Sequence, residues 1–277
     1  MNRLAPFAFL PLLALSLLSC AKIPEGPQQT GQLLRVTFTV RGQISSGGVN
    51  TNRYFVLLNR VDTPAEAGPI PIVTRPWGNG FAAPSQIGSQ GFVGFVLYDA
   101  FQGIGGYGVY TLQVPGTTTL LKPDSLGFAA FEGLRLGVPT NYVTPQPGEN
   151  QLSFQVDLSQ LPLSDKKYLQ INILATNAIP QGADDAPKYW DALGDGTNSE
   201  PGTLNSWILI DTGQDTIRTN SESRIEPETA DVRDRDLPSL VNAPDLDITD
   251  WRIELRNPTS PTPTPSPTPT PTPTPTP

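Results

Sequence analysis

The chain has 277 residues and is acidic, with 18 Lys and Arg against 26 Asp and Glu, a net charge of −8, no histidine and one cysteine. This charge argues against a nucleic-acid partner, because phosphate binding needs clustered Lys and Arg. Without histidine, Ser-His-Asp and Cys-His catalysis are excluded, as are zinc sites built from His and Cys.

Residues 1–19 have the organisation of a secretory signal peptide. A positive charge at Arg3 precedes an apolar run from Leu4 to Leu18, which is too short to span a bilayer as a mature helix. The N-terminus therefore predicts export.

The single cysteine ends the stretch Leu17-Leu18-Ser19-Cys20, which resembles the lipobox of bacterial lipoproteins. Leu18 departs from the more usual Ala or Ser at its position. The resemblance implies that Cys20 becomes a lipidated N-terminus carrying acyl chains such as palmitate, and several chains anchor a protein firmly where one does not. Where the host has two membranes, Ala21 resembles the outer-membrane sorting residue. The alternatives are a plain secretory signal with an incidental cysteine, or a short membrane anchor.

A linker, residues 20–32, leads to the expected folded domain, residues 33–256. The segment 33–40 alternates Leu34, Val36, Phe38 and Val40 with polar residues, which is typical of a strand with one buried face. The other predicted strands are Tyr54–Leu58, Phe92–Tyr98, Tyr107–Val114, Gln151–Leu158, Tyr168–Ala175 and Ser206–Ile210. The first two of these are apolar on both faces, as central strands are. We therefore expect an all-β fold, a single antiparallel β-sandwich (jelly-roll or Ig-like) of about nine to eleven strands.

The stretch 103–108 matches the glycine pattern of dinucleotide-binding loops. That chemistry needs a strand before the glycines and a helix after them, whereas a strand follows here. The glycines are therefore interpreted as a hairpin loop.

One helical turn is expected after Ala183. Asp184 or Asp185 suits a helix N-cap, Pro187 the first turn and Gly194 the C-cap. Trp190 and Leu193 would then share one face.

The last predicted strand contains a change of phase. Its apolar residues are Leu246, Ile248, Trp251, Ile253 and Leu255, so one extra residue falls near Thr249 and Asp250. A β-bulge there would keep both halves facing the core, with Trp251 buried. The alternative places Trp251 outward on a binding surface.

Residues 257–277 form a tail of prolines alternating with Thr and Ser. Proline fixes φ and removes a hydrogen-bond donor, so we expect a disordered, extended polyproline-II segment about 60 Å long. It could serve as a spacer or glycosylated stalk, as a docking segment for a partner that binds polyproline II, as the remnant of a longer gene, or as an unstructured tail without a specific partner.

Carboxylates and amides offer two further chemistries. A glycosidase needs two acids facing one groove, and the best-placed glutamates, Glu132 and Glu254, have the phase of solvent-facing residues. A calcium site could use Asp191, Asp195, Asn198 and Glu200, although their spacing is not that of an EF-hand and a solvated acidic turn is the alternative. We expect no other cofactor.

Aromatic residues in or beside loops are the remaining candidates for ligand binding. Trp77, Tyr107, Tyr142 and Trp190 could stack on sugar faces if two or three of them were coplanar and exposed. The alternative is that they close the ends of the sandwich core.

Three functions follow as hypotheses. The first is a non-catalytic lipoprotein, anchored by its lipid in the bacterial cell envelope (the outer membrane where there is one), that binds a polysaccharide or protein through sandwich loops. The second is a glycosidase-like enzyme with paired carboxylates. The third is a structural envelope protein that contacts partners through its Pro-Thr tail. In strand rhythm alone, the domain is loosely similar to carbohydrate-binding and DOMON-like sandwiches.

Overall fold

The structure is a computed structural model that describes residues 31–45, 52–65, 68–72, 80–82, 94–102, 105–112, 134–161, 166–180, 187–194, 206–221 and 241–258. The described residues form β-strands and two short 3-10 helices, η1 (Leu158–Gln160) and η2 (Ala243–Asp245). The strands are β1 (Leu33–Val40), β2 (Arg53–Val61), β3 (Gly94–Asp99), β4 (Tyr107–Thr111), β5 (Leu134–Gly137), β6 (Asn141–Val143), β7 (Gln151–Asp157), β8 (Tyr168–Thr176), β9 (Trp190–Ala192), β10 (Ile208–Asp211), β11 (Thr216–Thr219) and β12 (Ile248–Arg256).

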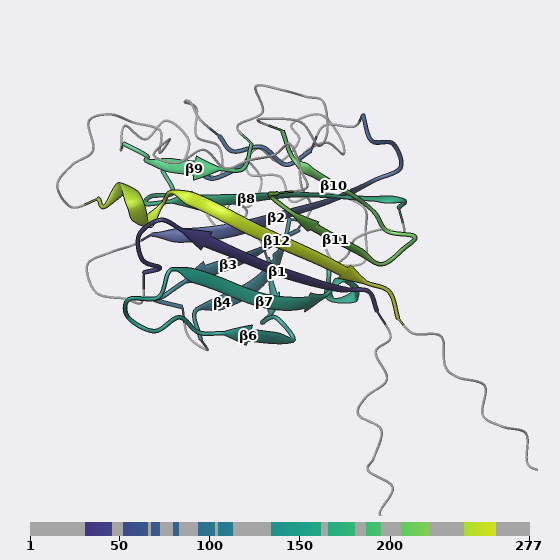
Figure 1. Ribbon diagram of the computed structural model, residues 1–277, viewed down its shortest axis with the longest axis horizontal. Coiled ribbons are helices and arrows are strands. Elements are labelled where there is room, and N and C mark those ends of the chain that lie inside the picture. Colours follow the sequence, from purple (N-terminus) through teal and green to yellow (C-terminus); the bar gives the residue numbers. More distant parts are fainter. Residues whose placement is uncertain are drawn as a thin grey trace, which may run out of the picture.

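These strands form two antiparallel sheets that pack face to face (Figure 1). The five-stranded sheet has the order β11-β12-β1-β7-β6, and the seven-stranded sheet the order β10-β8-β2-β3-β4-β5, with β9 also paired to β8. The prediction of an all-β sandwich is confirmed. The described residues alone contain twelve strands, more than the sequence predicted.

The central core lies between the two sheets. In β1, the residues Leu34, Val36, Phe38 and Val40 are all at most 1% exposed, and they meet inward-facing residues of both sheets. The period-two pattern thus places one face of β1 in the core and leaves its polar face outside.

A second apolar cluster covers the outer face of the seven-stranded sheet. Phe55 of β2 stacks on Phe81 with ring centroids 4.5 Å apart, and Phe95 of β3 stacks on Tyr110 of β4 at 4.9 Å. Aromatic pairs of this kind add to the free energy of burial. This cluster explains why β2 and β3 are apolar on both faces.

The β-bulge predicted in the last strand is confirmed. Thr39 of β1 pairs with Asp250 and its neighbour Val40 pairs with Ile248, so Thr249 is the extra residue. Trp251 is 1% exposed, and it packs in the central core rather than on the surface.

The predicted helical turn near Pro187 is wrong. Residues Trp190 to Ala192 form β9, which pairs antiparallel with the end of β8. Backbone pairing with a free strand edge has overridden the local capping signals. The side chains of Trp190 and Leu193 consequently pack in different clusters, the outer and the central one, instead of sharing a helix face.

The glycine-rich stretch lies in a β-hairpin, as predicted. β3 and β4 pair antiparallel, Tyr107 and Gly108 belong to β4, and Gly105 and Gly106 in the turn have φ values of 68° and 80°, while Gly103 and Ile104 lie outside the described residues. Such values are readily adopted by glycine, which explains these residues at the turn.

The two ends of the described domain lie side by side. Leu33 at the start of β1 pairs with Arg256 at the end of β12, and the side-chain amides of Gln32 and Asn257 are hydrogen-bonded at 2.6 Å. We call this the tail-bearing end of the sandwich (Figure 1). The opposite end, where β1 ends and β12 begins, is the far end.

Candidate functional site

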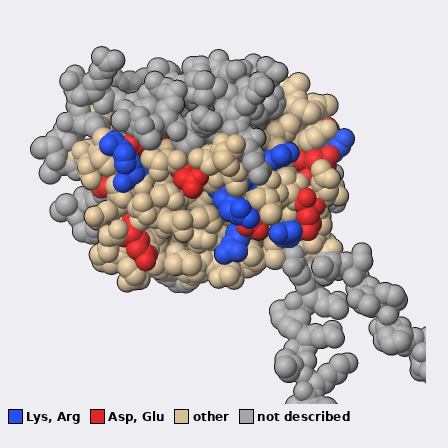
Figure 2. Space-filling model, viewed as in Figure 1, with Lys and Arg blue, Asp and Glu red and all other residues tan. Residues whose placement is uncertain are grey.

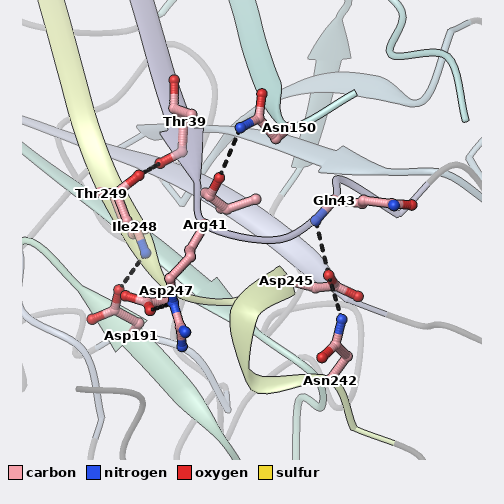
Figure 3. A network of polar contacts seen from close by, with 11 residues as sticks. Thr39, Arg41, Gln43, Asn150, Asp191, Asn242, Asp245, Asp247, Ile248 and Thr249 are labelled. Carbon is pink, nitrogen blue, oxygen red and sulfur yellow. Dashed lines mark hydrogen bonds and ion pairs between the residues drawn. The ribbon is translucent and has the colours of Figure 1, made fainter. Parts of the chain in front are cut away.

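A network of buried polar groups closes the far end of the sandwich (Figure 3). Asp191, Asp245 and Asp247 are each at most 7% exposed. They come from β9, η2 and the turn that leads into β12, so the topology brings together residues that are far apart in sequence. Buried carboxylates are costly unless they are paired or hydrogen-bonded.

Each of these carboxylates has an assigned contact. Asp247 forms an ion pair with Arg41, which follows β1. Asp245 accepts hydrogen bonds from the Gln43 backbone N–H and the Asn242 amide, both at 2.8 Å. The network fastens the chain after β1 to the segment before β12.

Asp191 is tied to the bulged strand. Its carboxylate accepts a hydrogen bond from the Ile248 backbone N–H at 2.7 Å, directly before the extra residue Thr249. The threonine hydroxyl in turn donates to the Thr39 carbonyl at 3.4 Å. The bulge is therefore held from both sides by polar contacts.

This arrangement bears on the predicted calcium ligands. Asp191 is buried and engaged with a backbone N–H, while Asp195, Asn198 and Glu200 lie outside the described residues. Within the described part of the chain, no group of three or more acidic, His or Cys side chains is arranged to hold a metal ion. The observed role of Asp191 is to accept a hydrogen bond from the bulged strand.

Two of the four predicted ligand-binding aromatics are buried. Tyr107 is fully buried between Tyr98 and Phe154, and its hydroxyl donates to the Val143 carbonyl at 3.0 Å. Trp190 is 6% exposed within the outer cluster. Both belong to strands whose faces are covered, so these two residues follow the alternative in which the rings pack in the core.

The other two predicted aromatics differ in position. Tyr142 of β6 is partly buried and packs on Tyr107, with ring centroids 5.1 Å apart. Trp77 lies outside the described residues. Of the described rings, Tyr107 and Tyr142 thus pack together at the central core, Trp190 lies in the outer cluster, and the three present no coplanar exposed strip.

Among the described residues, apolar exposure toward the far end comes from Phe101 and from Val143, which is 60% exposed at the end of β6. Phe101 lies in the turn between β3 and β4 and its side chain is 57% exposed. The backbone N–H of Phe101 donates a hydrogen bond to the Asp99 carboxylate at 3.0 Å. The Asp99 carboxylate also pairs with Arg53 at 2.8 Å. The turn is therefore fixed by charge-assisted contacts while its aromatic side chain faces solvent.

The predicted glutamate Glu254 lies on the outer face of the five-stranded sheet, where basic and acidic side chains are interspersed (Figure 2). Its carboxylate accepts a hydrogen bond from Arg252 at 2.8 Å and lies 3.7 Å from Arg256. The hydrogen bond from Arg252 holds the pKa of Glu254 below its usual range. A glycosidase acid needs the opposite shift, and Glu132 lies outside the described residues.

A buried lysine joins the outer cluster to β9. Lys188 is 5% exposed, and its Nζ donates to the carbonyls of Ile72 at 2.8 Å and Phe81 at 3.5 Å. Burial lowers its pKa to about 7. No sequence signal distinguished this lysine from an ordinary surface one.

The tail-bearing end contains a cavity of about 670 Å³. Its lining comes from six separate stretches of the chain, and its charged members are Arg60, Asp62, Lys166, Lys167 and Asp211. Gly31 and Pro258, the first and last described residues, also line it. These stretches meet only in the fold, so this cavity could not be predicted from the sequence.

Comparison with known proteins found no matching family model, no matching curated protein and no matching solved structure. Among the described residues, no helix is long and apolar enough to cross a membrane. The functional argument therefore rests on this chain's own residues and geometry.

Proposed function

We propose that this chain is a lipid-anchored, extracytoplasmic lipoprotein of the bacterial envelope that binds a polysaccharide or a protein without catalysis, through the loops at the far end of its β-sandwich. The observation that supports this proposal is the position of the chain ends. Gly31 and Pro258 both leave from the tail-bearing end. A lipid on Cys20 would then hold that end toward the membrane and direct the far end away from it.

The dimensions of the sandwich fit this role. β1 runs from the tail-bearing end to the far end over eight residues, or about 25 Å at roughly 3.3 Å per residue. The far-end loops thus stand clear of the attachment point by the length of a strand. The Asp191–Asp245–Asp247 network makes their base rigid, which suits recognition loops on a fixed scaffold.

The electrostatics of Glu254 do not suit the general acid of a glycosidase. Its pKa is lowered by Arg252, whereas a general acid needs a raised one. Within the described residues, the far-end carboxylates are occupied by Arg41 and by backbone and amide donors.

The anchoring half of the proposal can be tested in a two-membrane bacterial host. The full chain is expressed with a labelled fatty acid, beside Cys20→Ser and the matched leader variant Ser16→Ala. We expect label and membrane fractionation for wild type and Ser16→Ala, and neither for Cys20→Ser. Labelling that survives Cys20→Ser would refute the lipobox assignment.

The binding half needs a separate readout. The purified full chain is applied to a glycan array and to envelope proteins immobilised individually, together with Phe101→Ser and Ile217→Ser. Both residues are exposed apolar ones, but Ile217 lies on β11 and not in the far-end loops. Binding that is lost in Phe101→Ser and kept in Ile217→Ser supports the far end as the binding surface; equal loss in both, or no binding at all, contradicts it.

A further inference from the structure

We infer that the cavity at the tail-bearing end is a binding site for a phosphate group. The cavity is separate from the far-end loops and from the outer face that carries Glu254. Its lining contains three cationic side chains and two carboxylates, in a chain whose overall charge is −8. The cavity is therefore a locally cationic spot on an acidic protein, which favours an anionic ligand.

The two carboxylates of the lining are already engaged. Asp62 lies 3.6 Å from the Nζ of Lys166, and its side chain is 68% exposed. Asp211 accepts the backbone N–H of Gly213 at 2.9 Å. Asp62 thus offsets the charge of Lys166 and Asp211 is bound to a backbone donor, so the five charged side chains of the lining keep one excess positive charge.

The basic groups are positioned from different elements. Arg60, near the end of β2, is partly buried and its Nη2 donates to the Gln32 amide oxygen at 2.8 Å, a neutral partner. Lys166 precedes β8 and is 30% exposed. A guanidinium fork matches the oxygens of phosphate, and an ammonium group adds a point charge.

Lys167 stands at the exposed rim. Its ammonium lies 5.0 Å from the centre of the Tyr168 ring, and the carbonyls of Lys166 and Lys167 both contact the Thr212 hydroxyl, at 3.1 and 2.8 Å. The two lysines are thereby held on a backbone fixed to the turn after β10. The three basic residues thus line one cavity from two parts of the chain, β2 and the segment that leads into β8.

The size of the cavity narrows the ligand class. A volume of about 670 Å³ is in the range of small-molecule sites and exceeds what a bare phosphate fills. The ligand is then a phosphate joined to a small polar group. Both a phospholipid headgroup and a soluble phosphate ester have this chemistry, and the lipid source rests on the anchoring proposed above, because only an anchored protein would turn this end toward the membrane.

The test uses the purified full chain in a nonionic detergent, and the intact mass of the same preparation reports whether Cys20 is lipidated. Inorganic phosphate and glycerol phosphate are titrated by calorimetry. Bicelles of phosphatidylglycerol are then compared with bicelles of phosphatidylcholine. The variants are Arg60→Gln and Lys166→Gln, and Arg218→Gln on β11 is the matched control, since Arg218 is exposed and does not line the cavity.

We expect saturable binding of glycerol phosphate that weakens about ten-fold in Arg60→Gln and by a smaller factor in Lys166→Gln, with Arg218→Gln unchanged. If the protein prefers phosphatidylglycerol bicelles to phosphatidylcholine bicelles, and the cavity variants lose this preference, the bound phosphate belongs to a lipid headgroup. If only the soluble esters bind, it belongs to a soluble ligand. If Arg60→Gln does not fold, Lys166→Gln against Arg218→Gln decides. No saturable binding by the wild type, or equal effects of the cavity and control variants, overturns the inference, whatever the mass of Cys20 shows.

Discussion

Burial of Lys188 makes the stability of the fold depend on pH in a way that a single substitution removes. The pKa of Lys188 falls from the ordinary 10.5 to about 7 because its ammonium is desolvated in the outer cluster. Between these two values the unfolded chain holds the proton and the native chain does not. The free energy of unfolding therefore rises with pH in this window, by about 1.4 kcal/mol per pH unit from this one group.

From about pH 7.5 to about pH 9.5 the contribution amounts to roughly 3 kcal/mol. Lys188→Met keeps a flexible side chain of similar length and removes the titrating ammonium group. The free energy of unfolding of this variant should therefore not show the increase between about pH 7.5 and about pH 9.5 that Lys188 causes in the wild type. The window stays below pH 10, because burial raises the pKa of Tyr54 and Tyr107. Above their unfolded value of 10.0 the native state retains those phenolic protons, and stability falls as pH rises.

The measurement is urea unfolding followed by tryptophan fluorescence, with wild type and variant compared at each pH so that shared titrations cancel. The reporters Trp190, Trp207 and Trp251 are all buried in the native state. Lys167→Met is the control: that lysine is exposed and contact with Tyr168 raises its pKa, so it should add no slope in this window. Parallel stability profiles for wild type and Lys188→Met would refute the reasoning.

The remaining predictions concern the far end. Arg41→Met should lower the free energy of unfolding in urea by about 3 kcal/mol or more, because it leaves the fully buried Asp247 carboxylate without its ion-pair partner. Asp247→Asn should cost less, since the Arg41 side chain is 43% exposed and can turn to water. A larger loss of stability in Asp247→Asn than in Arg41→Met would contradict the buried-charge argument. Deletion of Thr249 should leave a cooperatively folded protein, because Ile248 and Asp250 then pair with β1 in the regular register. Deletion of Arg252 should prevent cooperative folding, since it turns the side chains of half of β12 to the wrong face of the sheet. Circular dichroism melting distinguishes the two deletions, and equal melting temperatures would show that the bulge does not set the register.

The strands that the sequence predicted well are those with a clear period. In β1 every second residue is apolar, so its bounds and its buried face were both readable. The same counting located the bulge, because Ile248 and Trp251 cannot face one core without an extra residue between them. The strands β5 and β6, of four and three residues, are too short to show a clear period and were missed.

The candidate site was less predictable, because its properties depend on tertiary burial. Asp245 and Asp247 alternate with the core residues Leu246 and Ile248, so the period alone assigns these carboxylates to the wet face. The fold buries them, and Arg41, some two hundred residues away, pairs with one of them. The burial of Tyr107, at the start of a predicted strand and beside a glycine-rich loop, was not predictable for the same reason: local composition does not show that β4 is covered on both faces.

The side-by-side ends of β1 and β12 also determine how the domain carries mechanical load. A force that separates the two tails acts across the ladder and opens Leu33–Arg256 first, then each following pair in turn. A force between the tail at Gly31 and a partner held at the far end runs along β1, perpendicular to its hydrogen bonds with β7 and β12, and loads them all at once. The domain should therefore unzip easily when Gly31 and Pro258 are pulled apart, and resist shear when force is applied between Gly31 and the far end.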